Sequence, residues 1–169
     1  MVIGIDADTR RLAIAAIGNG RVVRVGTIER GNQRGAVHPE YDAQLTRTMR
    51  WAQEVGAIVY LEDTYLPATG NDARNVRVLK SLNRVAGEIE RAARMHSVPL
   101  RLVSASAWRA GVLGTYGARE KHKAAAMARA MQYVNRDLTE HEADAICIAQ
   151  YGAMEEEHEI VQTRLECDQ

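Results

Sequence analysis

Apolar residues at the start of the chain form three short runs, each of which predicts a strand. Val2–Ile5 is continuously apolar, which is typical of a strand that is buried on both faces. Residues 12–17 and 21–28 follow, and the segment Gly18-Asn19-Gly20 between them favours a tight hairpin. We therefore expect the chain to open with an antiparallel meander of three strands.

After these strands, helical and strand patterns alternate. The further elements, in order, are a helix (about 40–55), a strand (57–61), a long helix (about 72–95), a strand (99–103), a short helix around Trp108, a helix (about 118–133) and a final helix from near Thr139. Strands that alternate with helices are typical of parallel crossovers. A plain doubly wound sheet would not begin with three consecutive strands. The order β-β-β-α-β-α-β-α-α instead predicts an α/β protein of the ribonuclease H-like fold, with a mixed five-stranded sheet flanked by helices.

Two helices carry clear apolar stripes at helical spacing. These are Tyr41, Leu45, Met49 and Ala52 (with Thr48) on the first helix, and Val76, Leu79, Leu82, Ala86, Ile89 and Ala93 on the long helix. Ser104 or Ser106 is expected to cap the short helix, and Thr139–Glu142 matches a capping box. Glycines 111, 114 and 117 predict a loop before the helix that begins near residue 118.

The chain has 169 residues, of which 46% are hydrophobic, so it is long enough for one domain with a buried core. Its formal net charge of zero hides an asymmetry, because residues 154–169 contain six acids and one base. The remaining 21 bases and 16 acids give residues 1–153 a net charge of +5. We expect a single ribonuclease H-like domain over 1–153 and an acidic C-terminal tail over 154–169. A basic body is compatible with a polyanion partner and equally with an ordinary solvated surface.

The number of cysteines and the hydropathy pattern indicate the cellular location to expect for the protein. Cys147 and Cys167 are too few for a disulfide framework or a zinc site. Cys147 lies in an apolar run, where a small core residue is the favoured interpretation. The sequence has neither an apolar run of membrane-spanning length nor a signal-peptide pattern at its start. These features lead us to expect a reducing, cytoplasmic location.

Four side chains able to bind a metal fall at the ends of predicted elements. Asp6 ends the first strand, and Glu62 ends the fourth, which the expected fold places beside the first. His141 and Asp144 are three residues apart and therefore share one face of the last helix. A carboxylate at the end of an apolar strand is costly without a partner, and a hard cation such as Mg²⁺ prefers oxygen ligands. Each residue alone has an ordinary structural explanation as a turn, strand-end or helix-start residue, so the joint arrangement carries the hypothesis.

These residues resemble a known family. Gly4-Ile5-Asp6, Leu61-Glu62 followed by Tyr65, and His141-Glu142-Ala143-Asp144-Ala145 are similar to the three acidic motifs of the RuvC-type Holliday-junction resolvases, over about Val2 to Tyr151. The resemblance implies a catalytic tetrad of Asp6, Glu62, His141 and Asp144 that binds two Mg²⁺ or Mn²⁺ ions. It also implies cleavage of four-way or branched DNA by symmetric nicks, and a homodimer built largely on the long helix.

The resemblance assigns further residues to DNA. Tyr65 matches an aromatic that opens the junction centre, although a core position explains it about as well. Lys121 matches a basic residue near the scissile phosphate, and Lys123 is the other candidate. Basic side chains at helical spacing on the long helix are expected either to touch phosphates or to form a solvated face; they are Arg74, Arg77, Lys80 and Arg84.

The sequence also departs from the family pattern and leaves rival functions open. Ala7-Asp8 stands where many members have proline and glycine, and so adds a carboxylate near the site, and the acidic tail is no part of the pattern. The Gly4–Asp6 segment with Thr9 also resembles the first phosphate loop of actin-like ATPases, but the chain is too short for two such lobes. A catalytically inert DNA-binding module and a ribonuclease acting on RNA/DNA hybrids remain alternatives on the same fold.

Overall fold

A five-stranded mixed sheet forms the centre of the molecule. The computed structural model describes residues 1–31, 37–63, 73–114 and 119–167. The strands are β1 (Val2–Ala7), β2 (Arg11–Gly18), β3 (Arg21–Glu29), β4 (Ile58–Glu62) and β5 (Leu100–Val103), in the order β3-β2-β1-β4-β5. The pairs β1–β2 and β2–β3 are antiparallel, whereas β1–β4 and β4–β5 are parallel. The expected α/β fold with a mixed five-stranded sheet is confirmed.

The β2–β3 hairpin turns where the sequence predicts it. Asn19 and Gly20 have φ angles of 51° and 71°, the left-handed values that a two-residue hairpin turn of this hand requires. Asparagine and glycine tolerate this region at low cost, so the turn helps to fix the register of the two strands.

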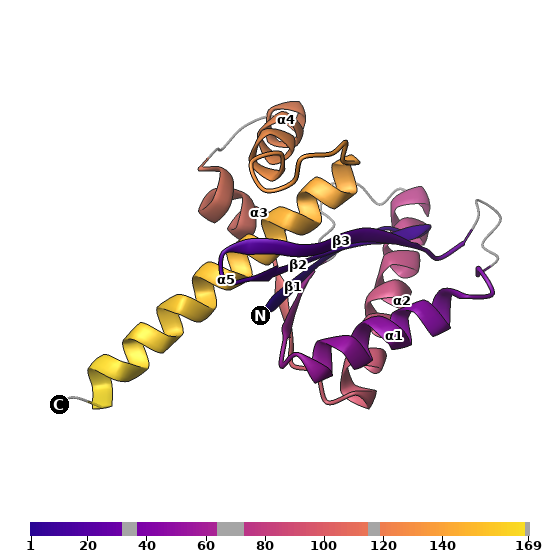
Figure 1. The fold of residues 1–169 in the computed structure, drawn as a ribbon. Helices are drawn as coiled ribbons and strands as arrows, with labels where there is room; N and C mark the ends of the chain where they lie inside the picture. Colours follow the sequence, from indigo (N-terminus) through magenta and orange to yellow (C-terminus); the bar gives the residue numbers. More distant parts are fainter. Residues whose placement is uncertain (32–36, 64–72, 115–118, 168–169) are drawn as a thin grey trace.

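Helices cover both faces of the sheet (Figure 1). On one face, α1 (Tyr41–Glu54) and α2 (Ala73–Met95) pack on Ile3 and Ile5 of β1. The elements on the other face are α3 (Ala105–Trp108), the single π-helical turn η1 (Arg109–Leu113), α4 (Arg119–Ala130) and α5 (Glu140–Cys167). The strands therefore contribute apolar side chains to two cores, one on each face of the sheet, as their continuous apolar runs predict.

Helix α5 crosses the sheet in very close contact with β1. A Cβ atom at Gly4 would overlap the carbonyl oxygen of Ala145 and the backbone nitrogen of Ala149. Further along α5, a Cβ atom at Gly152 would come within 2.5 Å of the Tyr60 ring on β4. Two glycines thus let α5 lie directly on the strands, which sets the height of its N-terminal residues above the sheet.

The C-terminal acidic residues continue α5 as far as Cys167. Part of this segment is attached to the sheet, because Glu156 accepts a hydrogen bond of 2.8 Å from the Tyr60 hydroxyl. Arg101 on β5 forms ion pairs with Glu156 at 3.2 Å and with Glu159 at 2.6 Å. The end of the helix extends away from the body (Figure 1). The division into a domain and a tail stays a prediction.

Most local expectations agree with the structure. The stripe on α1 is buried, Ser104 caps α3 by accepting from the Ala107 N–H, and no described helix is long and apolar enough to span a membrane. The loop predicted across the glycines is wrong at Gly111, which lies within η1. Its lack of a side chain instead makes room for the Tyr151 ring of α5, which a Cβ atom would approach to 3.0 Å.

Candidate active site

Two carboxylates leave the same edge of the sheet. On the parallel strands β1 and β4, Ile5 pairs with Leu61, so the next residues, Asp6 and Glu62, emerge side by side. Residues at the same end of neighbouring parallel strands meet at one edge, as the predicted fold requires. The first half of the expected constellation is therefore set by strand pairing.

The start of α5 brings two more side chains to this edge. The capping box forms as predicted, because the Thr139 N–H donates to a Glu142 carboxylate oxygen at 2.9 Å and the Glu142 N–H donates to the Thr139 hydroxyl at 3.2 Å. With the first turn held in this way, Nδ1 of His141 lies 2.5 Å from Oδ2 of Asp6. Asp144 follows on the same face of the helix, one turn further along.

All four predicted tetrad residues line one pocket of about 160 Å³. Its walls come from β1, β4, η1, α4 and α5, and its lining residues are Asp6, Glu62, Arg109, His122, Lys123, Glu140, His141 and Asp144. Residues far apart in the sequence thus converge on a small cavity that is lined by carboxylates, imidazoles and cationic side chains. Such a mixture is suited to acid–base and electrophilic chemistry.

The carboxylates in this pocket destabilise one another as anions. Burial, together with the charges of Asp6 and Glu62, raises the pKa of Asp144 from 3.8 to about 7. Burial and the Asp6 carboxylate also raise the pKa of Glu62 above its usual range. A cation bound here would be favourable, because it would offset both the mutual repulsion of the carboxylates and the cost of burying their charges. Carboxyl groups with pKa values perturbed in this way cluster at functional sites.

Comparison with known proteins identifies the fold that carries this pocket. No protein-family model and no curated protein sequence matches the chain. A solved structure of RuvC from Thermus thermophilus superposes with a TM-score of 0.64 at 18% identity, covering 90% of this chain and 92% of that chain. The structure of T. thermophilus RuvC in complex with a Holliday junction substrate superposes with a TM-score of 0.65 at 16% identity, with the same coverage. This chain has the RuvC fold.

Beside the pocket carboxylates, the structure places two residues whose roles the sequence did not indicate. Trp108 is fully buried, as a packing residue should be, but its indole Nε1–H also donates a hydrogen bond of 2.9 Å to Glu62. This bond works against the upward shift of the Glu62 pKa, because it favours the ionised carboxylate. Trp108 therefore orients a pocket carboxylate from behind.

Arg109 is the second such residue. It begins η1, lines the pocket, and lies with its guanidinium carbon 5.0 Å from the centre of the Trp108 ring. Its charge lowers the pKa of both Glu62 and Asp144, against the larger upward effects of burial. Its Nε is buried and has no hydrogen-bond partner among the described residues. A buried donor without a partner beside a polar pocket is a candidate ligand contact. No helical or strand period marked this arginine, because a π-helical turn follows neither.

His122 is a further pocket residue that the sequence analysis did not single out. It is partly buried, lines the pocket, and its Nε2 has no hydrogen-bond partner within the described parts of the chain.

Of the two lysine candidates, Lys123 lines the pocket and pairs with Glu140 at 2.5 Å, whereas Lys121 is exposed on α4 and is not part of the lining. Glu142, in contrast, has the structural role expected of it.

The remaining predicted contacts are placed only in part. Tyr65 lies outside the described residues, and of Arg74 only the backbone, within α2, is described. The other basic side chains of the stripe are exposed on α2; they are Arg77, Lys80 and Arg84. Asp8 is not in the pocket lining, but accepts hydrogen bonds from the backbone and the hydroxyl of Thr9. Its charge nevertheless contributes to a raised pKa of His141.

The donor set fits a hard divalent cation, although the side chains are not yet arranged around one. Within the described ranges, no group of three or more His, Cys, Asp or Glu side chains is close enough to hold an ion as it stands. Instead, His141 hydrogen-bonds one oxygen of Asp6. Three carboxylates that share a pocket, two of which have raised pKa values (Glu62 and Asp144), still supply the oxygen ligands and the excess negative charge that Mg²⁺ or Mn²⁺ requires. Ligation would require a change of side-chain conformation within the pocket.

Proposed function

We propose that this chain is a divalent-metal-dependent DNA endonuclease that cuts four-way junctions. One observation carries the proposal: Asp6, Glu62, His141 and Asp144 line a single pocket at the edge of a RuvC-like sheet. The similar RuvC from T. thermophilus has been solved with a Holliday junction substrate, which supports branched DNA as the substrate class. The sequence motifs and the pocket geometry support the same four residues from separate observations.

In this proposal Asp6, Glu62 and Asp144 would hold two Mg²⁺ or Mn²⁺ ions through their oxygen atoms. Bound ions of this kind activate water near neutral pH and neutralise charge on the phosphate that is being cleaved. Trp108 keeps Glu62 oriented toward the pocket through its 2.9 Å hydrogen bond. Partial burial of the three carboxylates limits the competition of water for them and strengthens their interaction with a cation.

His141 is suited to accept a proton from the attacking water. Its Nδ1 faces the Asp6 carboxylate at 2.5 Å, so the neutral ring keeps its proton on Nδ1 and leaves Nε2 as the acceptor. The same hydrogen bond raises the pKa of His141, which makes the ring a stronger base. His141 is also able to ligate an ion, as the family resemblance implies.

Arg109 and one lysine supply positive charge to the phosphate. The guanidinium of Arg109 has N–H donors available beside the carboxylates, and its Nε is buried in the pocket wall. Lys123 lies in the lining, while Lys121 is exposed on the same helix. These cations would offset the charge that develops on the non-bridging phosphate oxygens.

Paired nicks in a junction of near two-fold symmetry call for two equivalent active sites, which a two-fold homodimer supplies. The apolar stripe of α2 is the proposed contact. Its C-terminal part, including Ile89 and Ala93, is buried in the monomer core, whereas Val76 is 45% exposed. Tyr65, Arg74, Arg77 and Lys80 belong to the same stretch of chain, and we propose that they contact the junction arms and centre.

The experiment that tests the proposed function compares nucleic-acid substrates of one sequence. The protein is incubated with Mg²⁺ and a labelled four-way junction, a linear duplex or an RNA/DNA hybrid. We expect cleavage of the junction at symmetric positions, little cutting of the duplex, and none of either when EDTA replaces Mg²⁺. Preferred cutting of the hybrid would instead support a ribonuclease. Junction binding with no cutting under any divalent metal would identify a binding module.

A further inference from the structure

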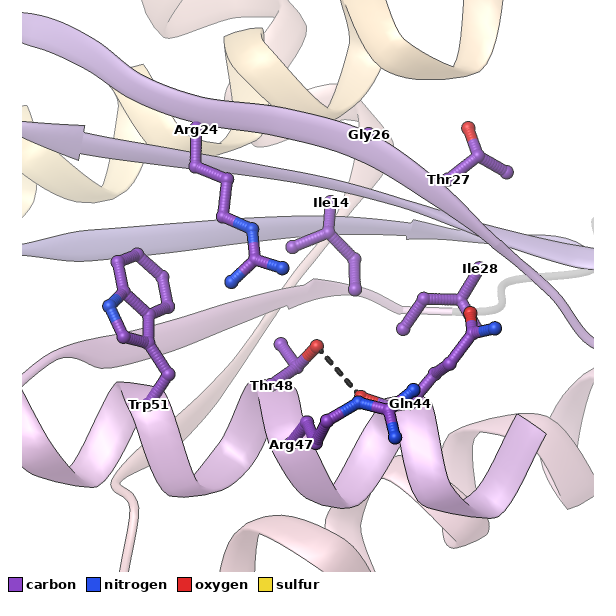
Figure 2. A pocket seen from close by; sticks show the side chains of 9 residues that line it. All are labelled: Ile14, Arg24, Gly26, Thr27, Ile28, Gln44, Arg47, Thr48 and Trp51. Carbon is purple, nitrogen blue, oxygen red and sulfur yellow. Dashed lines mark hydrogen bonds between the residues drawn. The ribbon is translucent and has the colours of Figure 1, made fainter. Parts of the chain in front are cut away.

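A second pocket lies on the opposite side of the sheet from α5, between the edge strand β3 and helix α1 (Figure 2). Its volume is about 390 Å³. The residues that line it are Ile14, Arg24, Gly26, Thr27, Ile28, Gln44, Arg47, Thr48 and Trp51. Not one of these is a carboxylate, and none lines the candidate active site. The pocket is therefore a separate cavity with a basic and aromatic lining.

The architecture of the pocket depends on Gly26. On β3, Arg24 and Gly26 pair with Ala16 and Ile14 of β2, whose side chains belong to the core beneath α1. A Cβ atom at Gly26 would meet nothing within 4 Å, so no side chain fills the space between Arg24 and Ile28. Figure 2 shows Ile14 and Ile28 pointing from the sheet toward α1 as an apolar floor.

The two arginines in this lining are not neutralised. Among the described residues, neither Arg24 nor Arg47 forms an ion pair with a carboxylate. The guanidinium carbon of Arg24 lies 5.3 Å from the centre of the Trp51 ring. Stacking on a ring occupies the face of a guanidinium and leaves its in-plane N–H donors available. Donors arranged in this fork match two oxygens of a phosphate group.

From these contacts we infer that the pocket binds a nucleotide unit, with its phosphate on Arg24 and Arg47 and its base against Trp51 and the apolar floor. An aromatic ring beside arginines is the combination that binds single nucleic-acid strands, because every base has a face that stacks and every unit has a phosphate. The unit comes either from a nucleic-acid strand or from a free nucleotide. The inference does not rest on the proposed nuclease activity.

Binding is measured in EDTA with thymidine 5′-monophosphate, a single-stranded oligothymidylate and inorganic phosphate as the probes. Calorimetry on the wild-type chain gives affinities, and fluorescence of a Trp108→Phe background reports on Trp51 alone. We expect both thymidine probes to bind and to quench Trp51. Tighter binding of the oligonucleotide identifies a strand as the source, and equal binding identifies a free nucleotide. The inference would be overturned if neither thymidine probe bound, or if inorganic phosphate bound as tightly as the mononucleotide, because the base would then contribute nothing.

Three variants locate the binding in the pocket. Gly26→Val adds a side chain where nothing stands within 4 Å and should therefore preserve the melting temperature while it fills the cavity. Arg24→Gln and Arg47→Gln should each weaken binding roughly tenfold, the usual size for the loss of a charge-assisted hydrogen bond. The matched control is Arg50→Gln, since Arg50 is exposed on α1 but is not in the lining. Wild-type affinity in the Gly26→Val variant, or equal losses in Arg24→Gln and Arg50→Gln, would contradict the inference.

Discussion

Nδ1 of His141 lies 2.5 Å from Oδ2 of Asp6, although 135 positions separate the two residues along the chain. Two local features create this contact. Gly4 lets α5 approach β1 without a side chain between them, and the Thr139–Glu142 capping box fixes the first turn of the helix. The imidazole then offsets part of the charge of Asp6, while Glu62 and Asp144 remain carboxyl groups with raised pKa values.

The first prediction is that the metal-free protein loses stability as the pH rises. The folded pKa of Asp144, about 7, is well above its usual value of 3.8, so its contribution to stability is complete below about pH 4 and is lost as the pH rises through 7. The raised pKa values of Glu62 and His141 act in the same direction. Urea unfolding at about pH 5.5 and pH 8 should therefore show a lower free energy of unfolding at the higher pH.

The control for this pH effect is Asp144→Asn, which has no proton to lose. Its free energy of unfolding should fall less between the two pH values, and above pH 7 the metal-free variant should be more stable than the wild type. Added Mg²⁺ should restore stability at high pH only where Asp144 is present, because binding to the folded state alone raises the free energy of unfolding. If the free energy of unfolding changed with pH in the same way in both proteins, the ionised Asp144 carboxylate would not be destabilised by the fold.

The second prediction concerns the contact between α5 and β1. Gly4→Ala forces a methyl group onto the backbone of α5 and should cost roughly 1–3 kcal/mol, the usual range for overpacking. It should also lower junction cleavage, because His141 and Asp144 move with the helix. Chemical denaturation and cleavage rates measure the two effects. The matched control is Gly87→Ala on α2, where the added Cβ meets nothing within 4 Å and helix propensity should raise stability slightly. A silent Gly4→Ala would contradict the proposed role of this close approach.

The third prediction tests Trp108 as a positioning residue. Trp108→Phe keeps an aromatic ring but removes the N–H that donates to Glu62, so the pKa of Glu62 should rise further. We expect Mg²⁺ affinity to fall about tenfold or more, the size seen when a group that orients a metal ligand is lost. The pH at which cleavage is half-maximal should move upward. Ile89→Val, a core truncation on the other face of the sheet, serves as the control for a purely structural loss of about 1 kcal/mol. Equal metal affinities in the two variants would remove Trp108 from the site.

Much of the fold was predictable because its signals are local. The Asn19-Gly20 turn, the buried stripe of α1 and the capping box of α5 each follow from a few neighbouring residues. The meeting of Asp6 with Glu62 required one further step, the expected parallel pairing of β1 with β4. Parallel pairing then carries both carboxylates to the same edge without any information on side-chain packing.

The parts of the site that were missed depend on packing between distant elements. Arg109 enters the pocket through a π-helical turn, for which the sequence has no characteristic apolar period. Gly111 belongs to the same turn, and it lacks a side chain because the Tyr151 ring occupies that space, not because the chain forms a loop there. In the sequence His122 is one polar residue among several, yet it is partly buried in the pocket wall. Arg109, His122 and Trp108 share no spacing that a sequence pattern could detect. Their proximity to the pocket carboxylates is visible only in the folded chain.

The most direct test of the account separates cutting from binding in variants of the carboxylates. Asp6→Asn and Asp144→Asn are compared with the wild type on one labelled four-way junction, with cleavage measured in Mg²⁺ and binding measured in EDTA. Loss of a metal ligand should lower the cleavage rate by about a hundredfold or more, because the cation supplies several kcal/mol to the reaction. Junction affinity should be kept or slightly improved, since removing a negative charge reduces repulsion of the phosphates. Cleavage by either variant at close to the wild-type rate would contradict the assigned centre.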